Sequence, residues 1–302
     1  MKVATIINYC SNEERFLYSC IEGAKPFSSE IIVVVCDHFF DGKLENLRAL
    51  ERVFEAFPEI TFVFYPYFDL SKKRIFQKVG AKNFWHCLSR FLGFDELSKD
   101  IDWVLFLDAD EVVDGRAFSA FLATQECQKY DVMKLANYWY FREPRYRANV
   151  WEDSAVWIRK NVVTQKLLLD KEERNVLYDK CKKEKKRQVV GLDQQPMVHH
   201  YSWVRSKEEM LRKVESWGHR EDKDWKVLIE EEFSHPFLGK DFVHGYSLEE
   251  VPSFLQEPKY PKKTESRAHV KKLSVFDVKK KLGWGIFRLV RMLKVLSFKC
   301  CL

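Results

Sequence analysis

The sequence has 302 residues, of which 46% are hydrophobic and 15% aromatic. A chain of this composition can bury a core, which excludes a disordered protein. The net charge of +6 is uneven, because residues 262–302 contain twelve Lys or Arg and two acids, and the rest of the chain carries −4. The first residues lack the apolar core of a signal peptide, no apolar run reaches the roughly 18 residues of a transmembrane helix, and the eight cysteines form no CxxC pair. We therefore expect a cytoplasmic protein with reduced thiols.

Strands and helices alternate through the first 115 residues. Short apolar runs predict strands, and helical spacing of apolar residues predicts the helices between them. The strands are expected at residues 3–7, 31–35, 60–64 and 103–107, and the helices at 13–25, 44–57 and 70–91. This order predicts an α/β fold with a mostly parallel sheet and helices on both faces. Ligands bind such sheets at the carboxyl ends of the strands, so the polar loops at 8–13, 36–42 and 108–111 should converge.

The pattern becomes irregular after residue 120. A highly charged run at residues 171–188 predicts a solvated helix or loop, and we expect no nucleic-acid partner. Ser206, followed by Glu209 three residues later, forms a capping box that predicts the start of a helix. The expected division is a nucleotide-sugar-binding half at 1–120, an acceptor-binding half with a helical extension at 121–260, and a basic tail at 261–302.

Two carboxylates, Asp108 and Asp110, follow the fourth predicted strand in a tight turn. Hard oxygen ligands in this arrangement suit Mg²⁺ or Mn²⁺. Such a metal can bridge a diphosphate and neutralise the charge that develops on it when a sugar leaves. Acidic turns after strands are common, so the motif alone would also fit plain surface acids.

The segments around these aspartates resemble a known family. IDWVLFLDADEVVDG resembles the aspartate-motif segment of glycosyltransferase family 2 and related nucleotide-diphospho-sugar transferases of the GT-A fold. VATIINYCSNEERFL is similar to their first strand and loop, EIIVVVCDHFFDG to their second strand and acidic loop, and Ala81-Lys-Asn83 to the basic residue and asparagine that precede the motif. The resemblance implies a Rossmann-like GT-A fold with a C-terminal helical extension. It also implies metal-dependent transfer of a sugar, with inversion, from a nucleotide donor to a glycan or lipid-linked acceptor.

The resemblance also implies roles for the matching residues. Asn8 and Tyr9 would lie beside the base of the nucleotide, Asp37 would bind the base or ribose, and Lys82 and Asn83 would contact the donor. Asp110, assisted by Asp108, would hold a diphosphate-bound Mn²⁺ or Mg²⁺. Many family members carry two adjacent aspartates where this chain has Cys36 and Asp37, so the nucleotide is left open, with a UDP-sugar as the expected donor.

Two histidines, His199 and His200, are candidate metal ligands. The resemblance implies a distant histidine that completes the metal site, and neutral imidazole is an acceptable ligand for Mn²⁺. His200 is the preferred candidate. The alternative is that one histidine packs in the core and the other caps the following helix.

A base for the acceptor hydroxyl is needed if the transfer inverts configuration. Glu152 and Asp153 are the candidates, because an acidic pair between two tryptophans suggests a sugar-binding pocket; Asp193 is a second choice, and an ordinary surface pair is the alternative. Arg205 is placed to contact the diphosphate, where a cation stabilises developing charge, although a surface helix would explain it equally well.

The C-terminal segment has a different character. Residues 270–298 place apolar and basic side chains on largely separate faces of a helix, which is typical of a helix lying on an anionic membrane. The alternative is a helix docked on the catalytic domain. Peripheral membrane contact through residues 270–302 would suit a lipid-linked acceptor.

Two other functions fit parts of the sequence. The run from Asp108 to Val112 matches the nucleophile motif of haloacid-dehalogenase phosphatases, although those enzymes carry it on their first strand. A catalytically inactive member of the GT-A fold, acting as a binding module at a membrane, is the other alternative. The aspartates and a downstream histidine argue against loss of the site.

Overall fold

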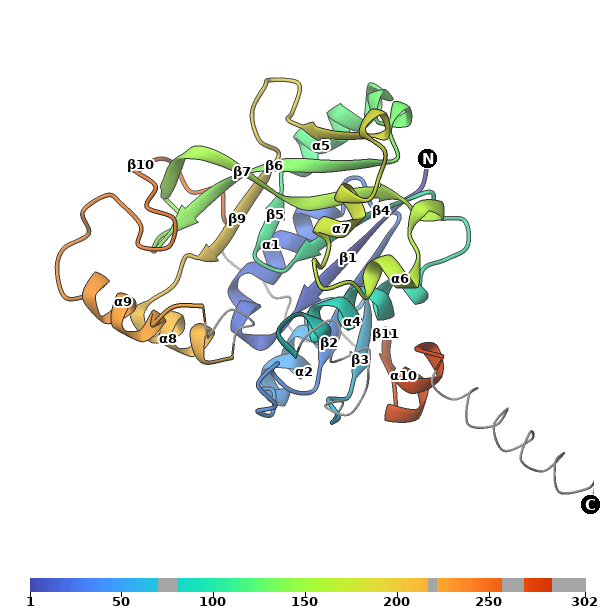
Figure 1. Ribbon diagram of the computed structural model, residues 1–302, viewed down its shortest axis with the longest axis horizontal. Coiled ribbons are helices and arrows are strands. Elements are labelled where there is room, and N and C mark those ends of the chain that lie inside the picture. The colour runs from blue at the N-terminus through green and yellow to red at the C-terminus, as the bar shows by residue number, and fades with distance from the viewer. Residues whose placement is uncertain (70–80, 217–221, 257–268, 284–302) are drawn as a thin grey trace, which may run out of the picture.

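The computed structural model describes residues 1–69, 81–216, 222–256 and 269–283. Their strands form a single twisted sheet, and helices cover both of its faces (Figure 1). The α/β class predicted from the sequence is therefore confirmed.

Four parallel strands form the half of the sheet that the alternating pattern predicted. They lie in the order β3 (Thr61–Tyr65), β2 (Glu30–Cys36), β1 (Val3–Tyr9) and β4 (Trp103–Asp108). Nearly every side chain in β1, β2 and β4 is buried, as expected for strands that are covered on both faces. Because the strands run parallel, the loops that follow them meet at one edge.

Helices α1 (Glu14–Ala24) and α2 (Leu47–Ala56) cover one face, and α4 (Ala81–Asp95) covers the other. Helix α1 approaches β5 (Glu111–Val113) very closely at Gly23. A β-carbon at Gly23 would lie 2.3 Å from the carbonyl oxygen of Val113, so only glycine fits there. This contact fixes the strand that follows the aspartate turn.

The sequence pattern did not reveal the strands that follow residue 120. β6 (Val132–Phe141) and β7 (Tyr146–Arg159) form a long antiparallel pair, and β9 (Val198–Trp203) runs parallel to β6 and antiparallel to β5. β7 also pairs antiparallel with β4, which joins the two halves in one sheet. Register shifts within the β6–β7 and β6–β9 pairs disturb the alternation of apolar and polar residues, which is why the sequence pattern conceals these strands.

Shorter elements complete the fold. The helices and 3₁₀ turns are η1 (Ser11–Glu13), α5 (Gly115–Ala123), η2 (Glu126–Lys129), η3 (Lys160–Val162), α6 (Gln165–Leu168), α7 (Asn175–Asp179), η4 (Lys183–Lys185), α8 (Lys207–Ser216) and α9 (Trp225–Glu232). The strands are β8 (Lys186–Val189), beside β6, and β10 (Leu248–Glu250), beside β7. The charged run predicted as a solvated helix or loop thus ends in a strand.

The capping box at the start of α8 is confirmed. The amide of Ser206 donates to Glu209 Oε2 at 2.8 Å, and the amide of Glu209 donates to Ser206 Oγ at 3.3 Å. The predicted domain boundaries near residues 120 and 260 remain predictions, and the sheet runs through both halves.

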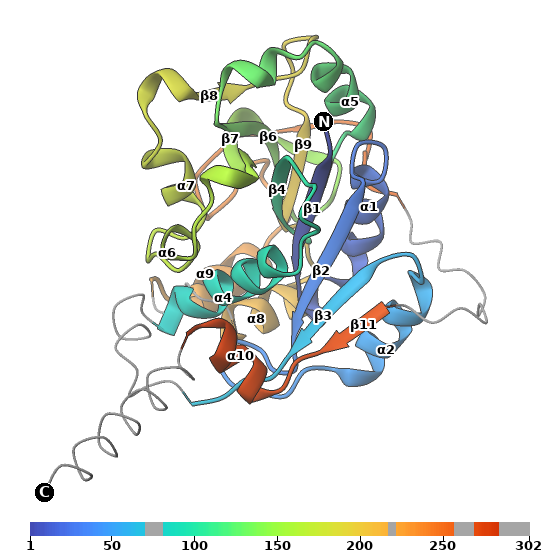
Figure 2. The same ribbon diagram turned by 90° about the vertical axis from the view of Figure 1, so that its right-hand side faces the viewer.

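The start of the predicted amphipathic tail needs correction. Residues 269–272 form strand β11 (His269–Lys272), which lies parallel to β3 at the edge of the sheet, and helix α10 (Val275–Lys281) follows it (Figure 2). Pairing with β11 satisfies the edge amides of β3. Two residues of the segment, Leu273 and Val278, are buried in the core beside α4. The rest of the proposed membrane helix lies outside the described residues. Within the described part of the chain, the structure has no helix with the length and apolar character needed to cross a bilayer.

Candidate functional site

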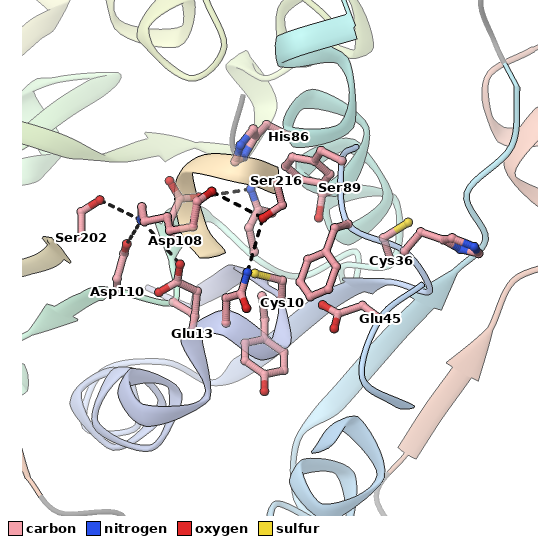
Figure 3. Close-up of a pocket in the computed structure, with 18 of the residues that line it drawn as sticks. Cys10, Glu13, Cys36, Glu45, His86, Ser89, Asp108, Asp110, Ser202 and Ser216 are labelled. Atoms are coloured by element: carbon pink, nitrogen blue, oxygen red, sulfur yellow. Dashed lines mark hydrogen bonds and ion pairs between the residues drawn. The ribbon is translucent and has the colours of Figure 1, made fainter. Parts of the chain in front are cut away.

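A cavity of about 250 Å³ lies at the carboxyl ends of β1, β2 and β4. All three loops that the sequence singled out contribute to its wall (Figure 3). Asn8, Tyr9, Cys10 and Glu13 come from the first loop, Cys36, His38 and Phe40 from the second, and Asp108 and Asp110 from the third. The parallel order of the strands brings these distant segments together.

Asp108 is held in place by three side chains. Asn8 Nδ2 donates to Asp108 Oδ1 at 3.2 Å, because the two residues are register partners in adjacent strands. Arg90 Nη2 donates to the same oxygen at 3.0 Å, and Arg174 Nη2 lies 3.5 Å from Oδ2. Burial alone would raise the pKa of Asp108, but Arg174 and Arg90 hold it well below its usual range. The carboxylate is therefore ionised at neutral pH.

Glu111 binds both the backbone of the aspartate turn and Arg174. Its buried carboxylate accepts a hydrogen bond from the amide of Asp108 at 3.0 Å and binds the guanidinium of Arg174 through both oxygens, at 2.6 and 2.5 Å. Burial would raise the pKa of Glu111, but Arg174 lowers it below the ordinary value. Arg174 belongs to the run predicted as solvated, so sequence reasoning missed this contact.

Asp110 faces His200 across the cavity wall. Asp110 Oδ1 lies 3.8 Å from His200 Nε2, and Asp110 Oδ2 lies 3.5 Å from Lys213 Nζ. The approach follows from the pairing of β5 with β9, in which Glu111 is the register partner of His200. The structure thus brings the preferred histidine to the second aspartate.

His199 lies on the opposite face of β9 from His200. Its Nδ1 is 2.8 Å from the hydroxyl of Tyr140, and its ring stacks on Phe254 with the centroids 3.9 Å apart. Burial lowers the pKa of His199 to about 3, and Arg147 adds to the effect. The structure therefore gives His199 the packing role that the sequence analysis held as the alternative.

Asp37 is engaged by its neighbour His38 and by the segment that follows β3. Its Oδ1 accepts a hydrogen bond from the amide of Tyr67 at 2.6 Å and lies 2.6 Å from His38 Nδ1, and the side chain is not part of the cavity wall. Glu45 lines the cavity instead, where its carboxylate accepts hydrogen bonds from the amides of Ser11 and Asn46, each at 2.8 Å. Burial raises the pKa of Glu45.

Two of the other residues predicted to contact the donor, Asn83 and Arg205, bind backbone carbonyls elsewhere in the protein. Asn83 Nδ2 donates to the carbonyl of Lys171 at 2.6 Å and so fastens α4 to the segment that carries Arg174. Lys82 lies in the first turn of α4, and its side chain is outside the described part. Arg205 is almost completely buried and is not part of the cavity wall. It pairs with Glu13 and donates to the carbonyl of Asn12 at 2.8 Å.

The two predicted catalytic acids, Glu152 and Asp153, have different partners. Glu152 accepts a hydrogen bond from the hydroxyl of Tyr246 at 3.2 Å, and its Oε2 lies 4.0 Å from His200 Nδ1. Asp153 instead pairs with Lys134 at 3.1 Å and contacts Gln188 in β8. Asp193, the second choice, is exposed and caps a turn by accepting from the amide of Gln195 at 3.0 Å. Of the three, Glu152 is the acid next to a cavity-lining residue.

A loop that sequence reasoning missed reaches Glu152 from the other side. The buried carboxylate of Asp241 accepts hydrogen bonds from the amides of residues 243–246, at 2.6 to 3.3 Å. This fixes His244 and Tyr246, whose rings stack 5.1 Å apart, and brings His244 Nε2 to 3.7 Å from Glu152 Oε1. The loop adds aromatic surface beside the acid, which suits a sugar-binding wall.

Five carboxylates contact four cations in the described part of the site. The acids are Glu13, Asp108, Asp110, Glu111 and Glu173, and the cations are Arg90, Arg174, Arg205 and Lys213. Of these, only the aspartates and Arg205 were sequence candidates. Arg90 could have been noticed in the sequence, because it is a charged residue within the apolar pattern of α4. In the structure its side chain is buried.

A resident metal site is not preformed in the described part of the chain. No three His, Cys, Asp or Glu side chains there are arranged to hold a metal ion. The donor chemistry nevertheless fits a hard divalent ion that also takes ligands from a substrate. Asp110 Oδ1 and His200 Nε2 face each other, and His200 Nδ1 is buried without a hydrogen-bond partner.

No protein-family model matches the chain, and no curated protein matches it. In structure it is similar to 4-diphosphocytidyl-2C-methyl-D-erythritol synthase from Anaerococcus prevotii, with 12% identity, a TM-score of 0.41 and coverage of 70% of this chain and 95% of that one. It is similar to the glycosyltransferase GlyE of Streptococcus pneumoniae, with 14% identity, a TM-score of 0.36 and coverage of 78% of this chain and 64% of GlyE. For TarS of S. aureus the identity is 11%, the TM-score 0.38, and the coverage 87% of this chain and 100% of that one. Glycosyltransferases are thus among the proteins to which the chain is similar in structure.

Proposed function

We propose that this chain is a glycosyltransferase of the GT-A type that binds a nucleoside-diphosphate sugar in the cavity above β1, β2 and β4. The observation that carries the proposal is the approach of Asp110 Oδ1 to His200 Nε2 at 3.8 Å in the wall of that cavity. These two residues are 90 positions apart in the sequence, and the resemblance assigned both to a metal site. The first loop, with Asn8 and Tyr9, and the second loop then form the nucleoside end of the cavity.

The charge of the site supports a metal. Five carboxylates against four cations leave one net negative charge in the contacting cluster. A nucleoside diphosphate adds further negative charge in a partly buried site, where repulsion is strong. Asp110 and His200 would hold Mn²⁺ or Mg²⁺, with Asp108 fixed beside them by its arginines. When bound, the metal would neutralise charge on the departing diphosphate.

Glu152 is the base that we assign to the acceptor. In an inverting transfer, the acceptor hydroxyl attacks the anomeric carbon and gives up its proton to a carboxylate. Glu152 is oriented by Tyr246 and lies 4.0 Å from His200, so it is next to the assigned metal ligand. Asp153, which is engaged by Lys134, is left out of this role.

The acceptor is a glycan or a lipid-linked sugar in this proposal, and the donor is a UDP-sugar. Contact with an anionic membrane through residues 270–302, and with it peripheral attachment, rests on the charge of that segment. The proposed cytoplasmic location rests on the cysteine pattern of the chain. Truncation after Lys272 tests the membrane contact, because the shortened protein should no longer sediment with anionic vesicles.

A donor screen tests the function. Thermal shift and donor hydrolysis are measured with UDP-, GDP-, dTDP- and CMP-sugars, with and without Mn²⁺, on the wild type, on Asp110→Ala and on the exposed control Asp193→Ala. We expect one donor to stabilise the protein and to be slowly hydrolysed with Mn²⁺, in the wild type and the control but not in Asp110→Ala. Binding without turnover would indicate the inactive binding module. Phosphate release from a simple phosphomonoester, without response to any donor, would indicate the phosphatase.

A further inference from the structure

Lys213 extends from α8 into the wall of the donor cavity. Its ammonium lies 3.0 Å from Ser202 Oγ, 3.5 Å from Asp110 Oδ2 and 3.6 Å from Glu13 Oε1. The side chain is 8% exposed. A buried lysine in this position places a complete positive charge beside the second aspartate, where little water screens it.

The other cations of the site pair with carboxylates other than Asp110. Glu13 pairs with Arg205, Glu111 with Arg174, and Glu173 with Arg90. Asp108 is contacted by Arg90 and Arg174. For Asp110, the lysine ammonium is the one Lys or Arg cation within 4.0 Å in the described part of the chain. Lys213 therefore neutralises the carboxylate that the proposed function assigns to the metal.

Lys213 also differs from the arginines in what it can offer to a ligand. Arg90 and Arg205 are not part of the cavity wall, and Arg174 is engaged by both oxygens of Glu111. Lys213 lines the cavity, and its ammonium lies 3.5 Å from the carboxylate of Asp110 and 3.6 Å from that of Glu13. A lysine ammonium is a compact charge on a flexible stem that commonly binds phosphate groups.

Building on the proposed function, we propose that Lys213 is a second cation for the diphosphate of the donor, one that acts without a metal. Its ammonium contacts the diphosphate of the bound nucleotide and provides part of the affinity when no divalent ion is present. The ammonium and the metal share Asp110, one at each carboxylate oxygen. In the absence of nucleotide they repel each other, so Lys213 keeps the affinity of the free protein for the metal low.

The test uses UDP and Mn²⁺ as separate probes on the full chain. The variants are Lys213→Met, which removes the charge, Lys213→Arg, which keeps it, and Lys207→Met, a control in the same helix whose lysine pairs with Glu230. UDP binding is measured by calorimetry in excess EDTA, and Mn²⁺ binding without nucleotide by electron paramagnetic resonance. The folding of each variant is monitored by circular dichroism.

We expect Lys213→Met to weaken UDP binding in EDTA by about tenfold or more and to strengthen Mn²⁺ binding by about tenfold. Lys213→Arg should retain UDP binding within about threefold, and Lys207→Met should match the wild type. If Lys213→Met binds UDP and Mn²⁺ as the wild type does, or if the wild type binds no UDP in EDTA, the assignment of Lys213 is overturned.

A second variant keeps the test valid if Lys213→Met does not fold. Ser202→Ala removes the hydroxyl that holds the ammonium at 3.0 Å, and we expect a loss of about threefold in metal-free UDP binding. An unchanged affinity in Ser202→Ala would then overturn the proposal. Failure of the wild type to bind any nucleoside diphosphate, even with Mn²⁺, would instead overturn the proposed function itself.

Discussion

Arg174 and Glu111 form a two-pronged ion pair beneath the aspartate turn, with N–O distances of 2.6 and 2.5 Å. The same carboxylate accepts the amide of Asp108, so the pair connects the segment around residue 174 to the strand end that carries the proposed metal site. Glu111 is completely buried and Arg174 is 11% exposed. The position of Asp108 therefore depends on an arginine 66 residues away in the sequence.

Removal of Arg174 should destabilise the fold. Arg174→Met leaves the carboxylate of Glu111 buried without its cation, and we expect the free energy of unfolding to fall by about 3–5 kcal/mol. Urea denaturation measures the change. In the double variant Arg174→Met with Glu111→Gln, the loss should be smaller than in the single variant, because residue 111 then carries no buried charge. A single-variant loss below about 1 kcal/mol would show that water screens the pair.

His199 should make stability depend on pH. Histidine in an unfolded chain has a pKa of about 6.5, whereas burial lowers the folded-state pKa of His199 to about 3. Between these values the unfolded state holds one more proton, so the contribution is complete above pH of about 6.5 and is lost as the pH falls toward 3. The slope due to this residue is at most about 1.4 kcal/mol per pH unit.

Denaturation curves from pH 4 to 7 on His199→Gln and on the exposed control His235→Gln check this. The His199 variant should show a shallower fall in unfolding free energy than the wild type, and the control should parallel the wild type. Equal slopes in all three proteins would mean that the pKa of His199 is not lowered in the folded state.

The two acids of β7 should differ in their effect on transfer. Glu152→Gln removes the proposed base, and we expect the turnover rate for the acceptor to fall by about 10²–10⁴-fold while the nucleotide affinity stays unchanged. Asp153→Asn, the matched control on the adjacent residue, should reduce turnover by less than about threefold. Steady-state kinetics with the donor found in the screen measure both. The assignment of Glu152 fails if the two variants are equally active.

The two adjacent histidines should likewise differ in metal binding. His200→Gln removes the nitrogen that faces Asp110, and we expect Mn²⁺ affinity in the presence of nucleotide to fall by about tenfold or more. His199→Gln should leave that affinity unchanged, since His199 packs against Phe254 on the other face of the strand. Titration of Mn²⁺ by electron paramagnetic resonance measures both affinities. A larger loss in the His199 variant would reverse the assignment.

The first half of the fold could be predicted from local sequence. The apolar runs of β1, β2, β3 and β4 and the helical spacing of α1 and α2 are strong signals, because strands buried on both faces are continuously apolar. The convergence of three loops followed from the rule that parallel strands end at one edge. The second half was missed, because register shifts in β6 and β7 interrupt the alternation that identifies a strand.

The residues of the site were likewise predicted only in part from local sequence. Local sequence supplied the aspartates, because a polar turn directly after an apolar strand is visible in the sequence itself. It preferred His200 to His199 but left Glu152 and Asp153 open, since these adjacent residues have similar side chains and differ in the face of the strand to which they point. It also placed Asp37 and Arg205 toward the donor, although Asp37 is engaged by the amide of Tyr67 and Arg205 by Asn12 and Glu13.

The sequence by itself determined the parallel α/β half and the position of the aspartate pair within it. Only the tertiary structure decided which distant charges meet those aspartates, among them Arg90, Arg174 and Lys213. The physical reason is that strand and helix signals are carried by residues close together in the chain, whereas an ion pair forms between residues that the complete sheet brings together. Nothing in the run at residues 171–188, or in α8, distinguishes a buried cation from a solvated one until the strands beside it are in place.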